Sequence, residues 1–202
     1  MLIIGITGPS GAGKGAVSEY FNTKYGFKVI DADKVYHQII SSPSDCVDEL
    51  VEHFGKAILN ENGGIDRKAL SSLVFGEENK ERLLLLNEIT HKYVIREIDE
   101  LISAYSKEGA EVTVIDAPLL IEAGVDKMCN YVIAVISNKD LRAQRIARRD
   151  GIDEEKALLR INSQKPDSFY KENCSRVLPN DLSLEELGLY TDQFLRCEGL
   201  IK

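Results

Sequence analysis

The sequence contains little cysteine, and its thiols are spread along the chain. Cys46, Cys129, Cys174 and Cys197 form no C-x-x-C pair, so neither a zinc site nor a dithiol redox motif is indicated. Long apolar runs are lacking as well, since none approaches the length of about 18 residues that a membrane-spanning helix needs. The N-terminal residues lack the basic segment and cleavage site of a signal peptide. We therefore expect reduced thiols, no membrane partner and a cytoplasmic location.

The sequence also has fewer basic than acidic residues. The 202 residues include 25 Lys and Arg against 33 Asp and Glu, a formal net charge of −8. So acidic a chain is a poor candidate for sequence-independent nucleic-acid binding, which depends on neutralising phosphates. A local basic cluster remains, formed by Arg142, Arg145, Arg148 and Arg149. The length and a hydrophobic content of 44% predict one globular domain over residues 1–202, with room for a small insertion.

A glycine-rich segment follows the first apolar run. Leu2–Thr7 leads into GPSGAGKG at Gly8–Gly15, and the helical run Ala16–Phe21 comes next. In the pattern G-x-x-x-x-G-K-[ST], backbone N–H groups surround nucleotide phosphates, the lysine reaches the β- and γ-phosphates, and the hydroxyl binds Mg²⁺. Lys14 is present, but Gly15 stands where the hydroxyl is expected. The context predicts a nucleotide-binding loop, and the alternative is an incidental glycine-rich turn.

Short apolar runs alternate with helical patterns along the chain, which predicts an α/β fold with a parallel sheet. Asp31 and Asp116 each end a predicted strand, where ligands bind in such sheets. For Asp116, helix capping or turn formation is an equal alternative. The predicted strands are Leu2–Thr7, Lys28–Asp31, Val112–Asp116, Tyr131–Ile136 and, more weakly, Arg176–Leu178.

Two segments extend beyond the simple alternation. About 80 residues separate the second and third strands, more than one crossover helix requires, so we expect an inserted helical lobe at about 60–105. Its best helix runs from about Glu78 to Ser106. The second segment, at about 139–166, has two helical patterns joined by Asp150-Gly151 and rich in arginine. We interpret it as a mobile lid, and a solvated pair of charged helices is the alternative.

The acceptor side of a phosphoryl transfer is expected just after the second strand. Transfer needs bound phosphates, neutralised charge and an acceptor held in line. Asp33 is placed to accept or orient the acceptor hydroxyl proton, unless it caps a helix at Lys34–Ile40. His37 lies one turn later on the same face, although a lone histidine is more often an ordinary polar residue. His91 and Arg96, in the lobe, are candidates to meet a charged part of the acceptor.

Nearly the whole chain resembles the dephospho-coenzyme A kinase family. No single motif decides this, but their order and spacing together are specific. The matching segments are Ile6–Gly8, Asp31–Asp33 with His37, Val74–Gly76, Leu86–His91, Asp116–Glu122, Arg145–Gly151, Arg160–Ile161 with Gln164, and Asn180–Asp181.

The resemblance implies ATP- and Mg²⁺-dependent phosphorylation of the ribose 3′-hydroxyl of dephospho-coenzyme A. It also implies a five-stranded P-loop sheet with flanking helices, a helical acceptor lobe and a lid. With the residues above, the predicted catalytic residues are Lys14, Asp33 and Arg149, with no protein side chain assigned as a metal ligand. The predicted nucleotide-binding residues are Gly8, Gly11, Ala12, Gly13, Lys14, Gly15, Ala16, Arg145 and Asn180. The predicted acceptor-binding residues are Asp33, His37, His91, Arg96, Pro118, Leu119 and Glu122.

The chain departs from the family pattern in three places. Gly15 and Ala16 replace a common hydroxyl pair, Lys92 replaces a proline, and Leu182 replaces a glycine. Adenylate-kinase-like enzymes also carry G-K-G here, with Mg²⁺ held largely by water and nucleotide oxygens. Gly15 is therefore expected to weaken Mg²⁺ binding more than to abolish transfer.

Two other functions fit the phosphate loop. A nucleoside or nucleoside-monophosphate kinase would share the loop and lid. The segments at Asp31–Asp33 and Pro118–Glu122 do not match the small-nucleotide acceptor pocket expected in such a kinase. A nucleotide-binding regulator without catalysis could dispense with Asp33 and the lid arginines. Asn138-Lys139-Asp140 is one residue short of the N-K-x-D guanine signature.

Overall fold

The computed structural model describes residues 1–201, and of Glu77 only the backbone. The chain divides into two compact units. The sheet unit comprises Met1–Ile30 with the residues from Tyr105 onward, and the helical unit comprises Asp31–Ala104. The predicted insertion at about 60–105 falls within the helical unit, which also includes the segment from Asp31 to 59. No helix in the described part of the chain has the length and apolar character of a membrane span.

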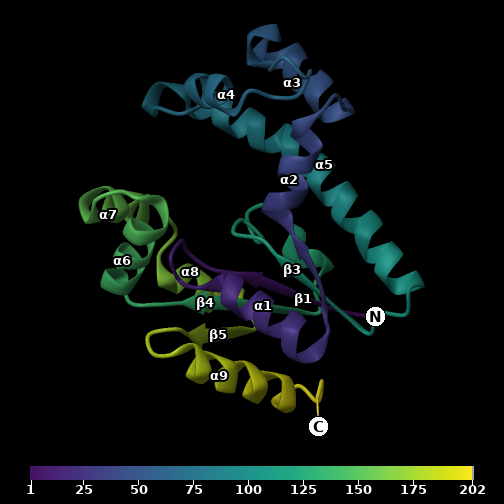
Figure 1. Cartoon of the computed structure of the whole chain (residues 1–202), viewed down its shortest axis with the longest axis vertical. Coiled ribbons are helices and arrows are strands. Elements are labelled where there is room, and N and C mark those ends of the chain that lie inside the picture. The colour runs from purple at the N-terminus through teal and green to yellow at the C-terminus, as the bar shows by residue number, and fades with distance from the viewer. Residues whose placement is uncertain (202) are drawn as a thin grey trace. The chain divides into compact units, whose positions relative to one another are not determined.

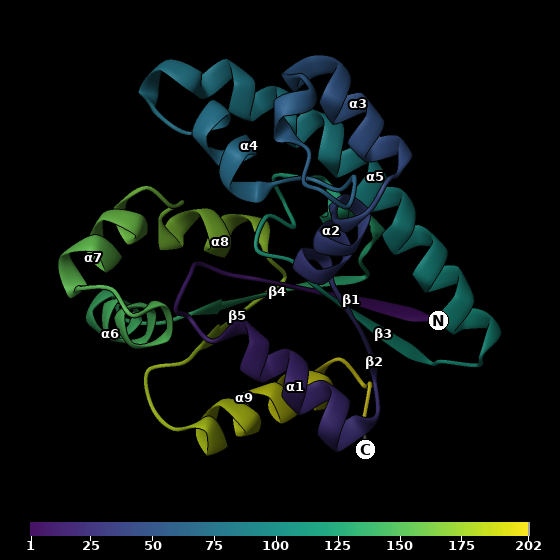
Figure 2. The same ribbon diagram turned by 45° about the horizontal axis from the view of Figure 1, so that its top comes forward.

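The sheet has five strands in the order β2-β3-β1-β4-β5 (Figures 1 and 2). β1 pairs in parallel with β3 and β4, and β4 pairs in parallel with β5. Ile4, Ile6 and Ile133 are fully buried, as expected for β-branched residues in a sheet covered on both faces. The predicted five-stranded parallel sheet is confirmed, with each strand at its predicted place. The strands are β1 (Leu2–Thr7), β2 (Lys28–Asp31), β3 (Val112–Asp116), β4 (Tyr131–Ile136) and β5 (Arg176–Pro179).

Five helices of the described chain belong wholly to the sheet unit. Figure 2 shows α1 and α9 on the same face of the sheet. Val17 and Phe21 of α1 and Phe194 of α9 are buried in one core with the strands. Burial of each such side chain stabilises the fold by about 1.5–3 kcal/mol. The helices are α1 (Lys14–Tyr25), α6 (Lys139–Asp150), α7 (Glu154–Asn162), α8 (Asp167–Asn173) and α9 (Leu184–Cys197), with a 3-10 helix at Val125–Met128.

A polar cluster also joins α1 to α9. The Asp192 carboxylate accepts hydrogen bonds from Tyr20 Oη at 2.9 Å, Tyr25 Oη at 2.6 Å and Lys24 Nζ at 2.6 Å. Burial by itself would raise the pKa of Asp192, but the three hydrogen bonds outweigh it and lower the pKa below its usual range. The helix that begins at the glycine-rich loop is thereby held to the C-terminal helix.

The helical unit has its own core. Ile40, Leu50, Ile58, Leu70 and Ile89 are buried together. As predicted, a long helix spans the second half of the insertion, from Lys80 to Lys107. The elements are α2 (Ala32–Ser41), α3 (Asp45–Phe54), α4 (Arg67–Val74) and α5 (Lys80–Lys107), with 3-10 helices at Lys56–Ile58 and Glu77–Asn79.

Candidate active site

The glycine-rich loop connects β1 to α1, and two of its glycines allow no other residue. Gly8 has φ 144°, and a Cβ there would lie 2.2 Å from the Val135 carbonyl oxygen. Gly13 has φ 97°, and a Cβ there would lie 2.1 Å from Asn180 Nδ2. Side chains rarely adopt such φ values, and both distances are far below van der Waals contact. The glycine spacing therefore reflects close packing of the loop against β4 and the segment after β5.

Three consecutive carbonyl oxygens of this loop accept hydrogen bonds from side chains outside it. Two donors are arginines of α6, and the third is the amide that follows β5. Ser10 O accepts from Arg142 Nε at 3.0 Å, Gly11 O from Arg145 Nη1 at 3.3 Å, and Ala12 O from Asn180 Nδ2 at 2.7 Å.

These hydrogen bonds orient the loop's N–H groups. In a planar trans peptide the C=O and N–H bonds point in opposite directions. The N–H groups of Gly11 and Gly13 therefore point away from the side chains that bind the carbonyls of Ser10 and Ala12. The Ala12 N–H group bonds to Pro9 O at 3.1 Å. Backbone N–H groups arranged in this way at a helix N-terminus form an anion-binding concavity.

A lysine–carboxylate pair lies at the start of α1. Lys14 Nζ contacts Asp116 Oδ1, and Ser18 Oγ donates to Asp116 Oδ2 at 2.6 Å. The Asp116 side chain is 8% exposed, so its charge depends on these two partners. Both carboxylate oxygens are thus engaged by α1, and Asp116 belongs to the loop's surroundings.

Gly15 is the second residue of α1. A Cβ placed there would have no heavy atom within 4 Å apart from its chain neighbours and the backbone of its own helix. Crowding at the Cβ position therefore does not explain the glycine.

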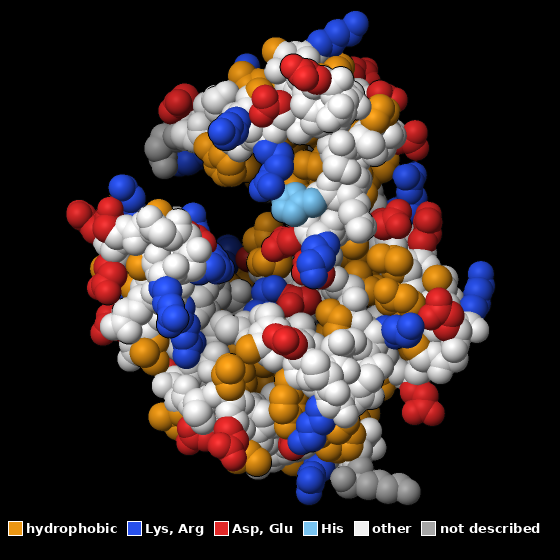
Figure 3. Space-filling model, viewed as in Figure 1, with side chains coloured by type: hydrophobic (Ala, Val, Ile, Leu, Met, Phe, Trp, Pro, Cys, Tyr) orange, Lys and Arg blue, Asp and Glu red, His pale blue; other side chains and the backbone are white. Residues whose placement is uncertain are grey.

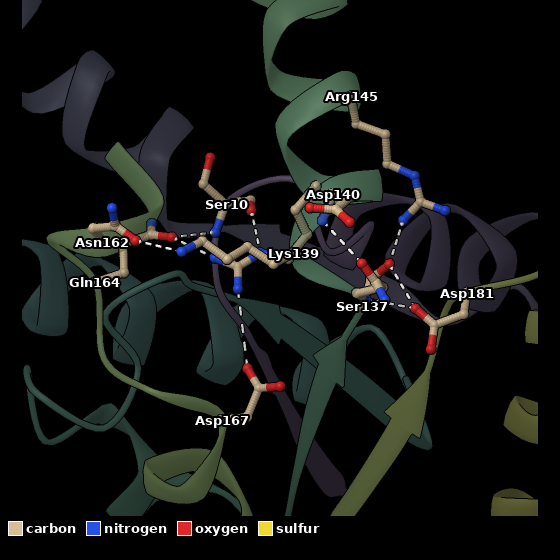
Figure 4. Close-up of polar contacts among 11 residues, drawn as sticks. Ser10, Ser137, Lys139, Asp140, Arg145, Asn162, Gln164, Asp167 and Asp181 are labelled. Carbon is tan, nitrogen blue, oxygen red and sulfur yellow. Dashed lines mark hydrogen bonds and ion pairs between the residues drawn. The ribbon is translucent and has the colours of Figure 1, made fainter. Parts of the chain in front are cut away.

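The two predicted lid helices are α6 and α7, joined through Gly151 at φ 65°. Figures 1 and 2 show them side by side, and Figure 3 shows both basic and acidic side chains over them. The structure separates the two predicted lid arginines. Arg145 contacts the loop and donates to Asn180 O at 3.0 Å. It also donates to Ser137 Oγ at 3.2 Å (Figure 4).

Arg149, predicted to be catalytic, lies at the end of α6 and pairs with its neighbour. Its Nε and Nη2 donate to the Asp150 carboxylate at 2.7 and 3.0 Å. Arg160 of α7 contacts the same carboxylate. Hydrogen bonds from Arg149 and Arg160 lower the pKa of Asp150 to about 2. Asp150 therefore stays ionised and joins the two helices at their tip.

The acceptor candidates Asp33 and His37 lie on α2. Asp31 caps this helix, because its Oδ1 accepts from the Lys34 N–H group at 3.0 Å. Asp33 lies within the first turn, so the alternative that Asp33 is the N-cap is wrong. His37 follows one turn later, and its buried Nδ1 has no hydrogen-bond partner within residues 1–201.

His91 and Arg96 lie on α5, where His91 is half-buried and Arg96 exposed. The Arg96 guanidinium lies 5.2 Å from the Tyr93 ring centroid and 3.9 Å from Asp45 Oδ2. Arg96 borders a pocket of about 260 Å³ within the helical unit. The pocket is lined by Gln38, Ile39, Ser42, Ser44, Asp45, Cys46, Tyr93, Arg96 and Glu97.

Lys92, one of the departures from the family pattern, has a structural contact. Its Nζ lies 2.5 Å from Glu49 Oε1. Tyr93 Oη donates to the other oxygen of the same carboxylate at 2.7 Å. These bonds lower the pKa of Glu49 and join α5 to α3.

The remaining acceptor candidates follow β3 in the sheet unit. Pro118 O accepts from Thr7 Oγ1 at 3.0 Å. Leu119 is 47% exposed, and Glu122 is exposed. The site residues thus divide between the units: Lys14, Pro118, Leu119, Glu122, Arg145, Arg149 and Asn180 belong to the sheet unit, and Asp33, His37, His91 and Arg96 belong to the helical unit.

Two residues that bind the loop had no predicted role there. Arg142, treated only as part of the lid's charge, is 5% exposed and binds the loop. Gln164 accepts a hydrogen bond from the Ser10 N–H group at 3.1 Å. One signal was available for Arg142, since it precedes the buried Ile146 by four residues and therefore shares its helix face.

The chain is similar to known proteins over most of its length. Residues 2–186 match the family model described as dephospho-CoA kinase. The dephospho-CoA kinase of Fusobacterium nucleatum is 40% identical over 200 residues, covering 99% of each chain. The solved dephospho-CoA kinase of Campylobacter jejuni is 27% identical, with a TM-score of 0.62 and coverage of 96% of this chain and 95% of that one.

A more distant likeness concerns the fold alone. Shikimate kinase from Acinetobacter baumannii is 14% identical, with a TM-score of 0.58 and coverage of 100% of this chain and 96% of that one. The fold is therefore shared with another kinase, whereas the family match continues through the helical unit and through α6 and α7. Because that match spans most of the sequence and includes every predicted site residue, the chain belongs to the dephospho-CoA kinase family.

Proposed function

We propose that this protein transfers the γ-phosphoryl group of ATP to the ribose 3′-hydroxyl of dephospho-coenzyme A. The products are coenzyme A and ADP, and the reaction is the last step of coenzyme A biosynthesis. The observation that carries the proposal is the family match over residues 2–186, which includes the phosphate loop and the acceptor candidates. A cytoplasmic location stays a prediction from the sequence.

The phosphates would be bound by the loop. The N–H groups of Gly11 and Gly13 are oriented by the hydrogen bonds at Ser10 O and Ala12 O. Lys14 supplies a positive charge at the start of α1, where the helix dipole also favours anions. In phosphoryl transfer, such positioning and charge neutralisation provide most of the catalysis.

The acceptor hydroxyl would be oriented by Asp33. Asp31 caps α2, so the Asp33 carboxylate is not needed as the helix cap. In this role the Asp33 carboxylate accepts the hydroxyl proton as the new phosphorus–oxygen bond forms and the bond to the ADP oxygen breaks. His37, with its unpartnered Nδ1 among the described residues, would bind a polar group of the acceptor, and Arg96 would bind an anionic one. Arg149, through lid closure, would neutralise charge on the transferred group.

The residues around the loop fit a magnesium ion that arrives with the nucleotide. Mg²⁺ usually keeps several waters and takes one or two carboxylates with substrate phosphates. Asp116 provides one carboxylate beside Lys14, and no group of three potential metal-binding side chains occurs among the described residues. Both Asp116 oxygens are already bound by Lys14 and Ser18, so nucleotide oxygens and water would hold most of the ion's coordination sites, and the bound ion would neutralise phosphate charge.

Gly15→Ser is expected to lower the Mg²⁺ concentration for half-maximal activity. The Cβ of a serine has open space at this position, and its hydroxyl adds an oxygen where related loops bind the ion. A change of up to about tenfold is expected, equivalent to about 1.4 kcal/mol. A magnesium titration of initial rates at fixed ATP measures it. Gly15→Ala, which adds the Cβ without the oxygen, is the control and should match the wild type; an equal requirement in all three proteins contradicts the prediction.

The proposed function is tested by comparing acceptors at saturating ATP. Rates of ADP formation with dephospho-coenzyme A, AMP, CMP and uridine are measured for the full chain. We expect dephospho-coenzyme A to be preferred, and ³¹P NMR of the product to show a 3′-phosphomonoester. Preference for one of the other acceptors would replace the proposal with a nucleoside or nucleoside-monophosphate kinase activity.

A further inference from the structure

A buried arginine outside the predicted site holds the tip of the phosphate loop. Arg142 Nε donates to Ser10 O at 3.0 Å, and Arg142 Nη2 donates to Gln164 Oε1 at 2.8 Å. The same Gln164 oxygen accepts from the Ser10 N–H group at 3.1 Å. In Figure 4 the Gln164 side chain points toward the backbone of Ser10. Both backbone polar groups of Ser10 are therefore bound by two side chains that themselves share a hydrogen bond.

The Arg142 side chain is buried, so its guanidinium needs hydrogen-bond partners within the protein. Arg142 is 5% exposed, and a buried guanidinium is costly unless its N–H groups are bound. Besides its hydrogen bonds to Ser10 and Gln164, the guanidinium has one nearby carboxylate among the described residues, since Asp167 Oδ1 lies 4.0 Å from Nη1. Burial lowers the pKa of Arg142 from its ordinary value, although an arginine stays charged at neutral pH. The guanidinium has few alternative positions, so its direction toward Ser10 O is well defined.

The hydrogen bonds among Arg142, Gln164 and Ser10 connect different structural elements. Arg142 lies on α6, whereas Gln164 lies between α7 and α8. The peptide from Ser10 to Gly11 is held by its carbonyl, so the Gly11 N–H group points away from Arg142. An incorrectly rotated peptide would present a carbonyl oxygen to a phosphate and would repel it. The orientation of this peptide therefore bears directly on anion binding.

We propose that Arg142 and Gln164 are positioning residues that set the phosphate affinity of the loop through Ser10, while contacting no substrate themselves. The proposal rests on the proposed function only in taking the loop as the nucleotide phosphate site. The proposed effect on phosphate affinity does not depend on which acceptor is phosphorylated. It assigns Gln164 a function that depends on its side-chain oxygen, since Oε1 accepts both hydrogen bonds described for this side chain.

This chemistry separates two substitutions of similar size. Gln164→Glu keeps an oxygen that accepts both hydrogen bonds and adds a charge complementary to Arg142. Gln164→Met keeps the length of the side chain but removes the acceptor. Asn162→Ala is the matched control, because Asn162 Oδ1 accepts from Lys139 Nζ at 2.7 Å and joins α7 to α6 without contacting the loop.

The experiment measures ADP and non-hydrolysable ATP analogue binding by calorimetry for the full chain and these three variants. Thermal midpoints and the KM values for ATP and dephospho-coenzyme A are measured in parallel. We expect Gln164→Met to weaken nucleotide binding and raise the KM for ATP about tenfold, the scale of one lost charge-assisted hydrogen bond. The KM for dephospho-coenzyme A should not change. Gln164→Glu and Asn162→Ala should bind nucleotide as the wild type does.

Wild-type nucleotide affinity in Gln164→Met overturns the proposal, as does equal weakening in Gln164→Glu and Gln164→Met. A fall in thermal midpoint with unchanged nucleotide binding also overturns it, because the role would then be structural. Should Gln164→Met fail to fold, Arg142→Lys is tested in its place. That variant keeps a cation but cannot span both acceptors with a planar fork, and we expect the same tenfold weakening. Failure of the wild type on dephospho-coenzyme A, with these binding differences intact, overturns only the proposed function.

Discussion

Asp33→Asn should bind ATP as tightly as the wild type while phosphorylating dephospho-coenzyme A about a thousandfold more slowly, within the range of general base catalysis. Asparagine keeps the size of the side chain but cannot take the hydroxyl proton. Asp33 lies in the first turn of α2, away from the cap. Losing its charge there costs the helix at most about 1 kcal/mol, so the fold should be retained.

The matched control for this variant is two residues away. Asp31→Asn makes the same chemical change at the N-cap, where asparagine caps as well as aspartate does. We expect near wild-type turnover from it. Single-turnover rates at saturating substrates, with separate calorimetry of ATP binding, distinguish the two variants. Turnover of Asp33→Asn within tenfold of the wild type would remove the proposed proton acceptor, and equal losses in both variants would indicate a general disturbance of α2.

Lys14→Met should lower kcat/KM about a thousandfold, the upper end of the cost of one electrostatic donor in a preorganised site. It should also destabilise the protein. The Asp116 side chain is 8% exposed and pairs with Lys14, so the variant leaves a buried carboxylate whose remaining hydrogen bond, among the described residues, comes from Ser18. Removing one member of a buried pair costs about 3–5 kcal/mol.

The double variant Lys14→Met with Asp116→Asn separates these two effects. The amide removes the unpaired charge, so we expect the free energy of unfolding to recover substantially. Activity should stay at the level of Lys14→Met or fall further. Urea unfolding and the coupled assay measure the two quantities on the same preparations. Recovery of activity in the double variant would mean that Lys14 serves mainly to neutralise Asp116.

Local sequence determined most of the secondary structure of this protein. The apolar runs gave four strands at their observed bounds, because burial in a parallel sheet selects β-branched residues. The glycine spacing located the phosphate loop. The start of α2 was misjudged, because Asp31 and Asp33 both favour helix starts and the spacing cannot decide which one caps. The capping box at Ser183 and Glu186 was present in the sequence but was not used to predict α9.

The contacts that shape the site were decided by tertiary structure alone. Lys14 and Asp116 are 102 positions apart, and Asn180 and Ala12 are 168 positions apart. Helix and strand signals depend on neighbours a few residues away, whereas these pairs meet through the strand order β2-β3-β1-β4-β5. Arg142 shows the difference most directly. Its charge is evident from the sequence, but its burial against Ser10 and Gln164 arises only when α6 and the segment after α7 pack against the loop.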